Sequence, residues 1–283
     1  MLSSSSTSCS HRKADHLTKP ADKPTEFVDS LAKGLAILES FDASRPEMTL
    51  SEVAKTVNLS PAAARRSLIT LEHLGFIGRN GKRFHLTPRI LTLGSSFYAA
   101  TRIEEVLQPE LRGLIEKFGD ASSIGTLDGH DVIYIAHVSV QRARRASANV
   151  GARYPAFATS MGRVLVAGMT DEKRRAWLSD LRAERLTSKT CIDPCRLGEE
   201  IEKVRENGYA TTVDQLDYGI TAIAVPVRNA EGDTVAALNS SGYTGLVTPE
   251  QLVEERLPEL RATASHIAHQ ITRYPVLGSV LAP

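Results

Sequence analysis

Two adjacent arginines, Arg65 and Arg66, follow three alanines in the stretch from Leu59 to Ile77, LSPAAARRSLITLEHLGFI. Guanidinium groups pair with phosphates and with the edges of guanine, and alanine side chains let a helix backbone come close to a partner. A face of alanines buries little apolar surface against the protein itself. No acidic residue occurs from residue 53 to residue 71, so this stretch is locally basic although the whole chain has a net charge of only +1. The pattern therefore indicates a helix that binds double-stranded DNA.

Helix-start signals lie on the N-terminal side of this stretch. Residues 27–41 show helical periodicity, and Thr49-Leu-Ser-Glu52 has the form of a capping box that opens a short second helix. Ser60 is a favoured N-cap, and Pro61 stands at the first helical position, where its missing N–H costs nothing. The sequence therefore predicts three helices, and the third carries the two arginines.

A basic hairpin is predicted directly after the third helix. Asn80-Gly81 lies between two short alternating segments, which is the sequence signal of a two-residue type I′ turn. Three helices followed by a basic hairpin make a winged helix-turn-helix, whose wing contacts the DNA backbone or the minor groove. The candidate DNA contacts on the helices and the wing are Thr49, Ser60, Ala62, Ala63, Arg65, Arg66, Thr70, Arg79, Lys82 and Arg83.

Two other interpretations of this region stay open on the sequence alone. The first is an ordinary surface helix next to a solvated hairpin that happens to be basic. The second is a winged helix that serves as a protein-interaction module. Salt-sensitive binding to DNA distinguishes both from the DNA-binding interpretation, because phosphate contacts release counterions.

The composition places the chain among soluble proteins. Its 283 residues, 42% hydrophobic and 24% charged, suit two domains of ordinary size. No apolar run approaches the ~20 residues that a membrane helix needs, and the first two dozen residues lack the apolar core of a signal peptide and read as a disordered arm. Cys9, Cys191 and Cys195 cannot build a disulfide framework, and no cluster of His and Cys supplies metal ligands. We therefore expect a cytoplasmic protein without metal or cofactor.

The second half of the chain reads as α+β. Residues 122–138 alternate around Asp128-Gly129 as a β-hairpin does, and no repeated βαβ crossover follows. Gly208 is placed to end a helix. Helices are expected over residues 89–101, 104–118, 160–168, 171–178, 197–207 and 252–273, and further strands over 146–150, 220–227 and 234–240.

Small polar residues mark two places where an acid could bind. Ser160 lies at the start of a predicted helix, where it could act as the cap, and the first N–H groups of a helix bind carboxylates without a dedicated cation. Asn239-Ser-Ser-Gly242 ends a predicted strand with small polar groups. Each residue also has an ordinary structural explanation, as a cap or a turn residue.

Several motifs, in this order, resemble the IclR family of transcriptional regulators. They are FVDSLAKGLAILESF, SPAAARRSLITLEHLGFI, LTPRILTLG, YPAFATSMGRVLVAG and NGYATTVDQLDYGITAIAVPVRNAEGDTVAALNSSG, and the likeness spans residues 27–273. It is similar above all to the branch that controls protocatechuate, 4-hydroxybenzoate and β-ketoadipate catabolism. The resemblance implies a regulator switched by a small carboxylate effector, such as an aromatic acid.

The resemblance also implies how the chain is organised. A disordered arm (1–26) would precede a winged helix-turn-helix domain (27–88). A linker helix and an α/β effector-binding domain similar to GAF and PAS folds (89–273) would follow, with a short tail (274–283). The family assembles as dimers or dimers of dimers, and one recognition helix reads only a few base pairs, so at least a dimer is expected. Carried over by position, the effector contacts are Ser160, Met161, Thr212, Ala222, Asn239 and Ser241.

Two positions depart from the pattern of that branch. Relatives often have Gly-Leu-Arg-Ser where this chain has Gly219-Ile-Thr-Ala222, so one partner for an effector carboxylate is absent. Pro61 stands where a basic residue is expected ahead of the alanines and arginines. The first departure bears on the identity of the effector and the second on the operator sequence.

An enzyme is the alternative from another class. The chain contains no Gly-x-Ser-x-Gly, His-Glu-x-x-His or P-loop pattern. His130 lies between Asp128 and Asp131 in a predicted hairpin turn, which is more often a solvated tip than a general base. No catalytic residue is therefore assigned. Saturable binding of small aromatic acids without turnover separates a regulator from an enzyme.

Overall fold

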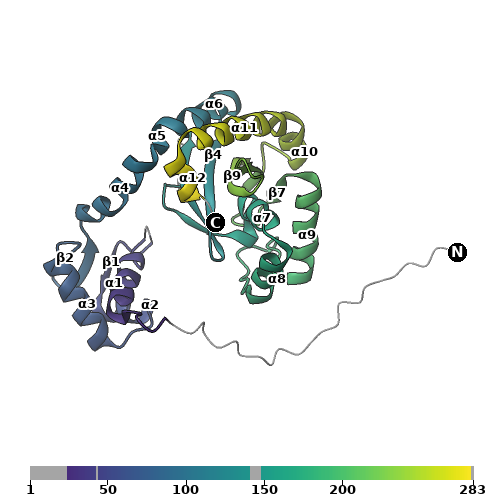
Figure 1. The fold of residues 1–283 in the computed structure, drawn as a ribbon. Helices are drawn as coiled ribbons and strands as arrows, with labels where there is room; N and C mark the ends of the chain where they lie inside the picture. The colour runs from purple at the N-terminus through teal and green to yellow at the C-terminus, as the bar shows by residue number, and fades with distance from the viewer. Residues whose placement is uncertain (1–23, 43, 141–147, 282–283) are drawn as a thin grey trace. The chain divides into compact units, whose positions relative to one another are not determined.

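The computed structural model describes residues 24–42, 44–140 and 148–281 (Figure 1). The chain forms two compact units, and the boundary between them lies between Phe97 and Tyr98. Most of the expected N-terminal arm lies outside the described residues. Within the described ranges, no helix is long and apolar enough to cross a membrane.

The first unit combines three helices with a three-stranded antiparallel sheet in the order β1-β3-β2. This is the predicted winged helix-turn-helix, with the addition of a short strand, β1, ahead of the second helix. Its elements are α1 (Asp29–Glu39), β1 (Glu47–Thr49), α2 (Leu50–Thr56), α3 (Pro61–His73), β2 (Ile77–Asn80) and β3 (Arg83–Leu86).

Both predicted helix starts are confirmed. The Thr49 hydroxyl accepts from the Glu52 amide and the Glu52 carboxylate accepts from the Thr49 amide, which is a complete capping box for α2. The Ser60 hydroxyl accepts from the Ala63 amide at 3.3 Å, and Pro61 is the first residue of α3. The inner faces of the three helices then meet on Ile37, Val53 and Leu68, which are fully buried.

The hairpin is present, but its turn differs from the prediction. Asn80 pairs with Arg83, so the two loop residues are Gly81 and Lys82 and not Asn80-Gly81. Gly81 has a φ of 60°, while Lys82 is not among the residues with positive φ. A single positive φ at the first loop position is the pattern of a type II′ turn, which requires glycine there. The predicted type I′ turn is therefore wrong by one residue.

The segment after the hairpin contains more helix breaks than the two expected helices, 89–101 and 104–118, allow for. A 3₁₀ turn at Pro88–Ile90 precedes α4 (Leu91–Thr101), which ends where Arg102 adopts a left-handed φ of 53°. The predicted helix over 104–118 is divided into α5 (Ile103–Val106) and α6 (Gln108–Phe118). Pro109 explains the division, because a proline inside a helix cannot donate to the carbonyl one turn before it.

The second unit is built on one six-stranded antiparallel sheet, in the order β6-β5-β4-β9-β8-β7. The predicted strand at 146–150 is not found: residues 146–147 lie outside the described ranges, and 148–150 are not extended in a sheet. The sequence also gave no sign of β7. The strands are β4 (Ala121–Asp128), β5 (Asp131–Ser139), β6 (Arg153–Pro155), β7 (Ala210–Val213), β8 (Ile220–Arg228) and β9 (Thr234–Tyr243).

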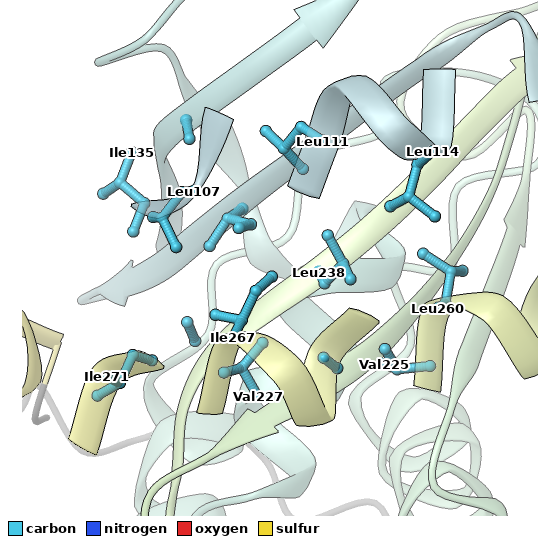
Figure 2. Close-up of a cluster of buried hydrophobic side chains, with 14 of the residues drawn as sticks. Leu107, Leu111, Leu114, Ile135, Val225, Val227, Leu238, Leu260, Ile267 and Ile271 are labelled. Atoms are coloured by element: carbon cyan, nitrogen blue, oxygen red, sulfur yellow. The ribbon is translucent and has the colours of Figure 1, made fainter. Parts of the chain in front are cut away.

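One face of this sheet packs against α6 and the closing helices. Leu111 and Leu114 of α6 and Ile267 of α11 point toward strand residues such as Leu238 (Figure 2). The predicted closing helix is interrupted, and the expected tail contains a helix whose Leu277 is fully buried. The segments are α10 (Pro249–Gln251), a π-helical turn (Leu252–Arg256), α11 (Leu257–Arg273) and α12 (Pro275–Leu281).

The other face of the sheet lies under α7 (Ser160–Ala167), α8 (Asp171–Asp180) and α9 (Pro194–Asn207) (Figure 1). Gly208 ends α9 with a left-handed φ of 73°, as predicted. Helices on both faces of an antiparallel sheet make an α+β domain, the predicted class. Because α7 lies directly on β8 and β9, its N-terminal end meets the sheet surface.

Candidate functional site

The third helix of the first unit presents its two arginines on the side away from the core. Arg65 and Arg66 are exposed, as is Ala62, whereas Ala64 and Leu68 are fully buried. Among the described residues, neither guanidinium group has a hydrogen-bond or ion-pair partner. A small exposed side chain beside two unpaired cations is what a helix needs to approach a polyanion.

The three cations of the hairpin differ in what holds them. Arg83 lies 3.3 Å from the Glu52 carboxylate, and Arg79 donates to the Gly81 carbonyl at 2.8 Å. Lys82 at the tip has no partner in the described part of the chain. Lys82 is therefore the hairpin cation that is freest to reach a phosphate.

The candidate hydroxyl groups of this unit already have protein partners. Thr49 and Ser60 cap their helices, and the Thr70 hydroxyl donates to the Arg66 carbonyl at 3.0 Å. Ala63 is partly exposed beside Ala62. Thr49 and Ser60 set where α2 and α3 begin, and so orient the basic face.

A cavity of about 370 Å³ opens in the second unit, on the α7 side of the sheet. Of the six candidate effector contacts, the structure brings five together around it: Ser160, Thr212, Ala222, Asn239 and Ser241. Met161 is not in this lining. Its side chain is fully buried in the apolar cluster beneath α7.

A row of small side chains across five strands explains the floor of the cavity. Cross-strand pairing joins Ser139 to Ala121, Ala121 to Ser241, Ser241 to Ala222 and Ala222 to Thr212. Directly opposite residues of a sheet share a face, so these five line up beneath one volume. Because all five are small, the sheet surface is hollowed where larger residues would fill it.

The next row of the sheet is polar. Ser123 pairs with His137 on one side and with Asn239 on the other. The Ser123 hydroxyl lies 2.9 Å from His137 Nδ1, and the Ser123 amide donates to the Asn239 side chain at 2.8 Å. Burial lowers the pKa of His137 below the ordinary 6.5, so its ring is neutral at neutral pH. Neither Ser123 nor His137 is among the effector contacts predicted from the sequence.

A β-bulge is the reason why His137 faces the cavity. The pairing of β4 with β5 shifts between Ile124 and Gly125, which leaves Ile135 as the extra residue of β5. Tyr134 and His137 then line the same cavity, although strict alternation puts residues three apart on opposite faces. A Cβ on Gly125 would lie only 2.9 Å from the Ile133 carbonyl oxygen. A glycine inside a strand is the signal that could have revealed this bulge.

The N-terminus of α7 forms one wall. Its cap is Thr159 and not Ser160, because the Thr159 hydroxyl accepts from the Gly162 amide at 3.0 Å. The Thr159 carbonyl accepts from the amide of Arg163. The first amides of a helix have no acceptor within it, and of the first two residues of α7 only Ser160 lies in the cavity lining, so its amide is the one placed to bind an oxyanion.

An ion pair governs the charge of the cavity rim. Asp120 lies in the lining, and its carboxylate is 2.9 Å from the guanidinium of Arg256, which is 4% exposed. Arg256 also donates to the Ser240 hydroxyl at 2.9 Å. The negative charge of Asp120 is thereby balanced next to the place where an acid would enter.

The loop between β7 and β8 forms another part of the wall, through Leu216 and Asp217. Arg163 of α7, itself buried, donates to the Gln215 side chain at 2.9 Å and lies 2.8 Å from Glu200. The loop is therefore tied to α7. Thr221, at the position where relatives often have arginine, is fully buried and not in the lining.

His130 takes no part in this cavity. Its ring lies 4.9 Å from that of Trp177, and its Nε2 is 3.4 Å from the Asp180 carboxylate. Asp128 and Asp131 both pair with Arg153. His130 is thus part of a structural cluster at a hairpin, in line with the prediction that assigned it no catalytic role.

Comparison with known proteins gives the same two parts. Residues 30–81 match the IclR helix-turn-helix domain, and residues 97–269 match the bacterial transcriptional regulator IclR C-terminal domain. The Pca regulon regulatory protein of Pseudomonas putida is 36% identical over 87% of this chain and 85% of its own length. The p-hydroxybenzoate hydroxylase transcriptional activator of Acinetobacter baylyi is also 36% identical, over 87% and 93%.

A solved structure covers much of the second unit. The inducer-binding domain of a double mutant of the PobR transcription factor from Acinetobacter, in complex with 3-hydroxybenzoic acid, is 35% identical to this chain. It covers 58% of this chain and 96% of its own, with a TM-score of 0.55. The winged helix-turn-helix, the α+β domain and these matches agree in order and extent. The chain belongs to the IclR family of bacterial transcriptional regulators.

Proposed function

We propose that this regulator binds an aromatic acid in the cavity of its second unit and that the acid alters its binding to operator DNA. The observation that carries the proposal is the convergence of five candidate contacts with the start of α7 on one cavity of about 370 Å³. Such a volume suits a molecule with a single ring, enclosed by apolar walls and a few polar groups.

The relatives support an aromatic acid as the ligand class. One is named for the hydroxylase of p-hydroxybenzoate, and the structure similar to the second unit holds 3-hydroxybenzoic acid. The ligand carboxylate is proposed to accept from the amide of Ser160 at the start of α7. This arrangement needs no arginine at position 221, where the chain has Thr221.

DNA is proposed to lie against the exposed side of α3 and the tip of the hairpin. Arg65 and Arg66 supply the contacts that distinguish sequences, and Lys82 supplies a phosphate contact. Thr49, Ser60 and Thr70 act mainly by fixing the helices that carry the arginines. A cytoplasmic location is proposed as well, because the operator DNA would be met there.

The protein is proposed to act as a dimer or a dimer of dimers. Leu31 and Leu35 of α1 are exposed on one stripe together with Val28, the N-cap residue, at 63%, 49% and 57% of their full accessibility. An apolar stripe at this spacing suits packing against the same stripe of a second copy. Two copies also double the length of DNA that is read.

Binding without turnover is proposed, although the cavity contains a serine and a histidine in contact. In the Ser123–His137 pair, no acidic group orients the other ring nitrogen among the described residues. A hydrolase needs this third partner to hold the base in the reactive tautomer. Incubation of the protein with hydroxybenzoates and their esters should leave their chromatographic profiles unchanged.

Calorimetry with aromatic acids tests the proposal. Ser241→Leu should fill the floor of the cavity, and Ser160→Pro should remove one amide donor from a position that tolerates proline. Both variants should lose at least tenfold in affinity, while their DNA binding without ligand is kept. Ser179→Leu, on an exposed turn of α8, is the control. Unchanged affinity in both cavity variants would place the ligand elsewhere.

A further inference from the structure

One polar atom of the cavity wall is left without a partner. His137 Nε2 is buried and has no hydrogen bond among the described residues, whereas Nδ1 of the same ring lies 2.9 Å from the Ser123 hydroxyl. A buried polar atom that goes unpaired destabilises the folded protein. Such an atom in a binding site calls for a group that the protein itself does not supply.

The ring is held in place from three sides. The bulge at Ile135 turns it to the cavity face, Ser123 fixes Nδ1, and the Tyr134 ring lies 6.2 Å away. Nε2 is shielded from water, so solvent cannot satisfy it. The His137 ring lines the cavity, so a molecule that is bound there lies against this ring.

The charge of the ring decides which ligand group fits. Burial lowers the pKa of His137, so a neutral imidazole faces the ligand. A neutral ring has one donor and one acceptor nitrogen, and the role of Nδ1 toward Ser123 fixes the opposite role for Nε2. A hydroxyl both donates and accepts, so it fits either tautomer. A carboxylate can only accept, and the amide of Ser160 at the start of α7 is available to it.

We propose that His137 Nε2 exchanges a hydrogen bond with a ring hydroxyl of the aromatic acid, so that the regulator selects hydroxylated benzoates over benzoate itself. The inference rests on the proposed function, because it needs an aromatic acid in this cavity. It sets the direction of the ligand, with the carboxylate at α7 and the hydroxyl toward the row of Ser123 and His137. His137 is then a specificity-determining residue.

Calorimetry with three acids and two proteins tests this inference. Benzoate, 3-hydroxybenzoate and 4-hydroxybenzoate are titrated into the wild-type protein and into His137→Phe, which keeps a ring but has no nitrogen. In the wild type, the better hydroxybenzoate isomer should bind about tenfold more tightly than benzoate, the gain of one well-placed hydrogen bond. In His137→Phe this ratio should fall to about one, with the affinity for benzoate unchanged.

Four results of this titration would overturn the inference. A ratio that persists in His137→Phe places the hydroxyl on another group, and an equal loss for all three acids makes His137 a wall residue only. If no acid binds the wild type, the proposed ligand class fails and this inference fails with it. A ratio near one in the wild type, with all acids bound, overturns the inference alone.

A second measurement does not depend on the variant. The imidazole ¹⁵N resonances of His137 in the wild-type protein should shift at Nε2 when the better hydroxybenzoate is added, and much less with benzoate. Equal shifts with both acids contradict a hydrogen bond to the hydroxyl. His137→Gln, which retains a polar head, should restore part of the preference that His137→Phe loses.

Discussion

Arg65 and Arg66 differ from Arg45 and Arg83 of the first unit because their guanidinium groups are unpaired within the described residues. Arg83 and Arg45 lie 3.3 Å and 2.5 Å from carboxylates, so their charge is already balanced. Neighbouring charges within a few ångström decide whether a cation is available to DNA. We therefore expect DNA binding to depend most on the two arginines of α3.

Replacing either arginine should weaken DNA binding more than replacing a paired one. Arg65→Ala and Arg66→Ala should each cost ~1–3 kcal/mol at the operator where the guanidinium contacts a base edge. Arg45→Ala, in the same unit, should cost little. Electrophoretic mobility shifts at one salt concentration measure this. Equal effects of all three replacements would mean that only net charge matters.

Lys82 should behave differently from the two arginines. As a phosphate contact at the wing tip, its replacement by alanine should weaken binding to all sequences alike and reduce the slope of log affinity against log salt by about one. Titrations at several salt concentrations, on operator and unrelated DNA, give this slope. A loss confined to the operator would assign Lys82 to base reading instead.

His137 also has a consequence for stability against pH. Its folded pKa is lowered by burial, so the unfolded chain binds a proton that the folded ring resists. This contribution to stability is complete above about pH 6.5 and is lost as the pH falls through the unfolded and then the folded pKa. Urea unfolding at several pH values should show a steeper acid loss for the wild type than for His137→Phe. Parallel curves would show that the ring titrates normally.

The elements that the sequence predicted best are those whose signals are local. Thr49, Ser60 and Gly208 act through their own neighbours, so the starts of α2 and α3 and the end of α9 could be read directly. The bulge in β5 depends on the close approach of β4 at Gly125, and β7 depends on pairing with β8. Contacts between distant segments decide such features, which is why Ser123 and His137 were not anticipated, although Asn239 of the same row was.

Two glycines in helices of the second unit should respond oppositely to alanine. A Cβ on Gly162 of α7 would lie 2.1 Å from the Ala156 carbonyl oxygen, whereas nothing lies within 4 Å of one on Gly113 of α6. Gly162→Ala should destabilise the unit by more than about 2 kcal/mol through overpacking. Gly113→Ala should stabilise it by roughly 0.5–1 kcal/mol. Thermal unfolding of both variants checks the pair, and a stable Gly162→Ala would contradict the tight packing of α7.

The whole molecule must connect two activities that lie in separate units. The chain passes from one unit to the other within α4, between Phe97 and Tyr98. A ligand in the second unit can change DNA binding only by its differential affinity for two arrangements of the assembly, typically 1–3 kcal/mol. The size of the change in DNA binding should therefore follow the difference between the acid's affinities for the two arrangements, and not its overall affinity alone.

The exposed stripe on α1 should be required for assembly. Leu31→Glu places a charge at its centre and should shift the protein toward monomers in light scattering, with a matching loss of operator affinity. Lys33→Glu on the same helix is the control, since it changes more charge outside the stripe. An unaltered oligomer in Leu31→Glu would assign the contact to another surface.

Because of the bulge in β5, substitutions in this strand and changes of its length should have different consequences. Around the bulge, the side chains of Tyr134, His137 and Ser139 line the cavity. The side chains of Ile135, Ala136 and Val138 belong to the core beneath α6. Codons for the first three can be randomised together without emptying the core, so a library at these positions should yield folded sensors with new chemical preferences. Adding or removing one residue between His137 and Ser139 would instead turn the residues beyond it to the opposite face and cost the fold. New specificities in this lineage should therefore arise by substitution in β5, and length changes there should be rare.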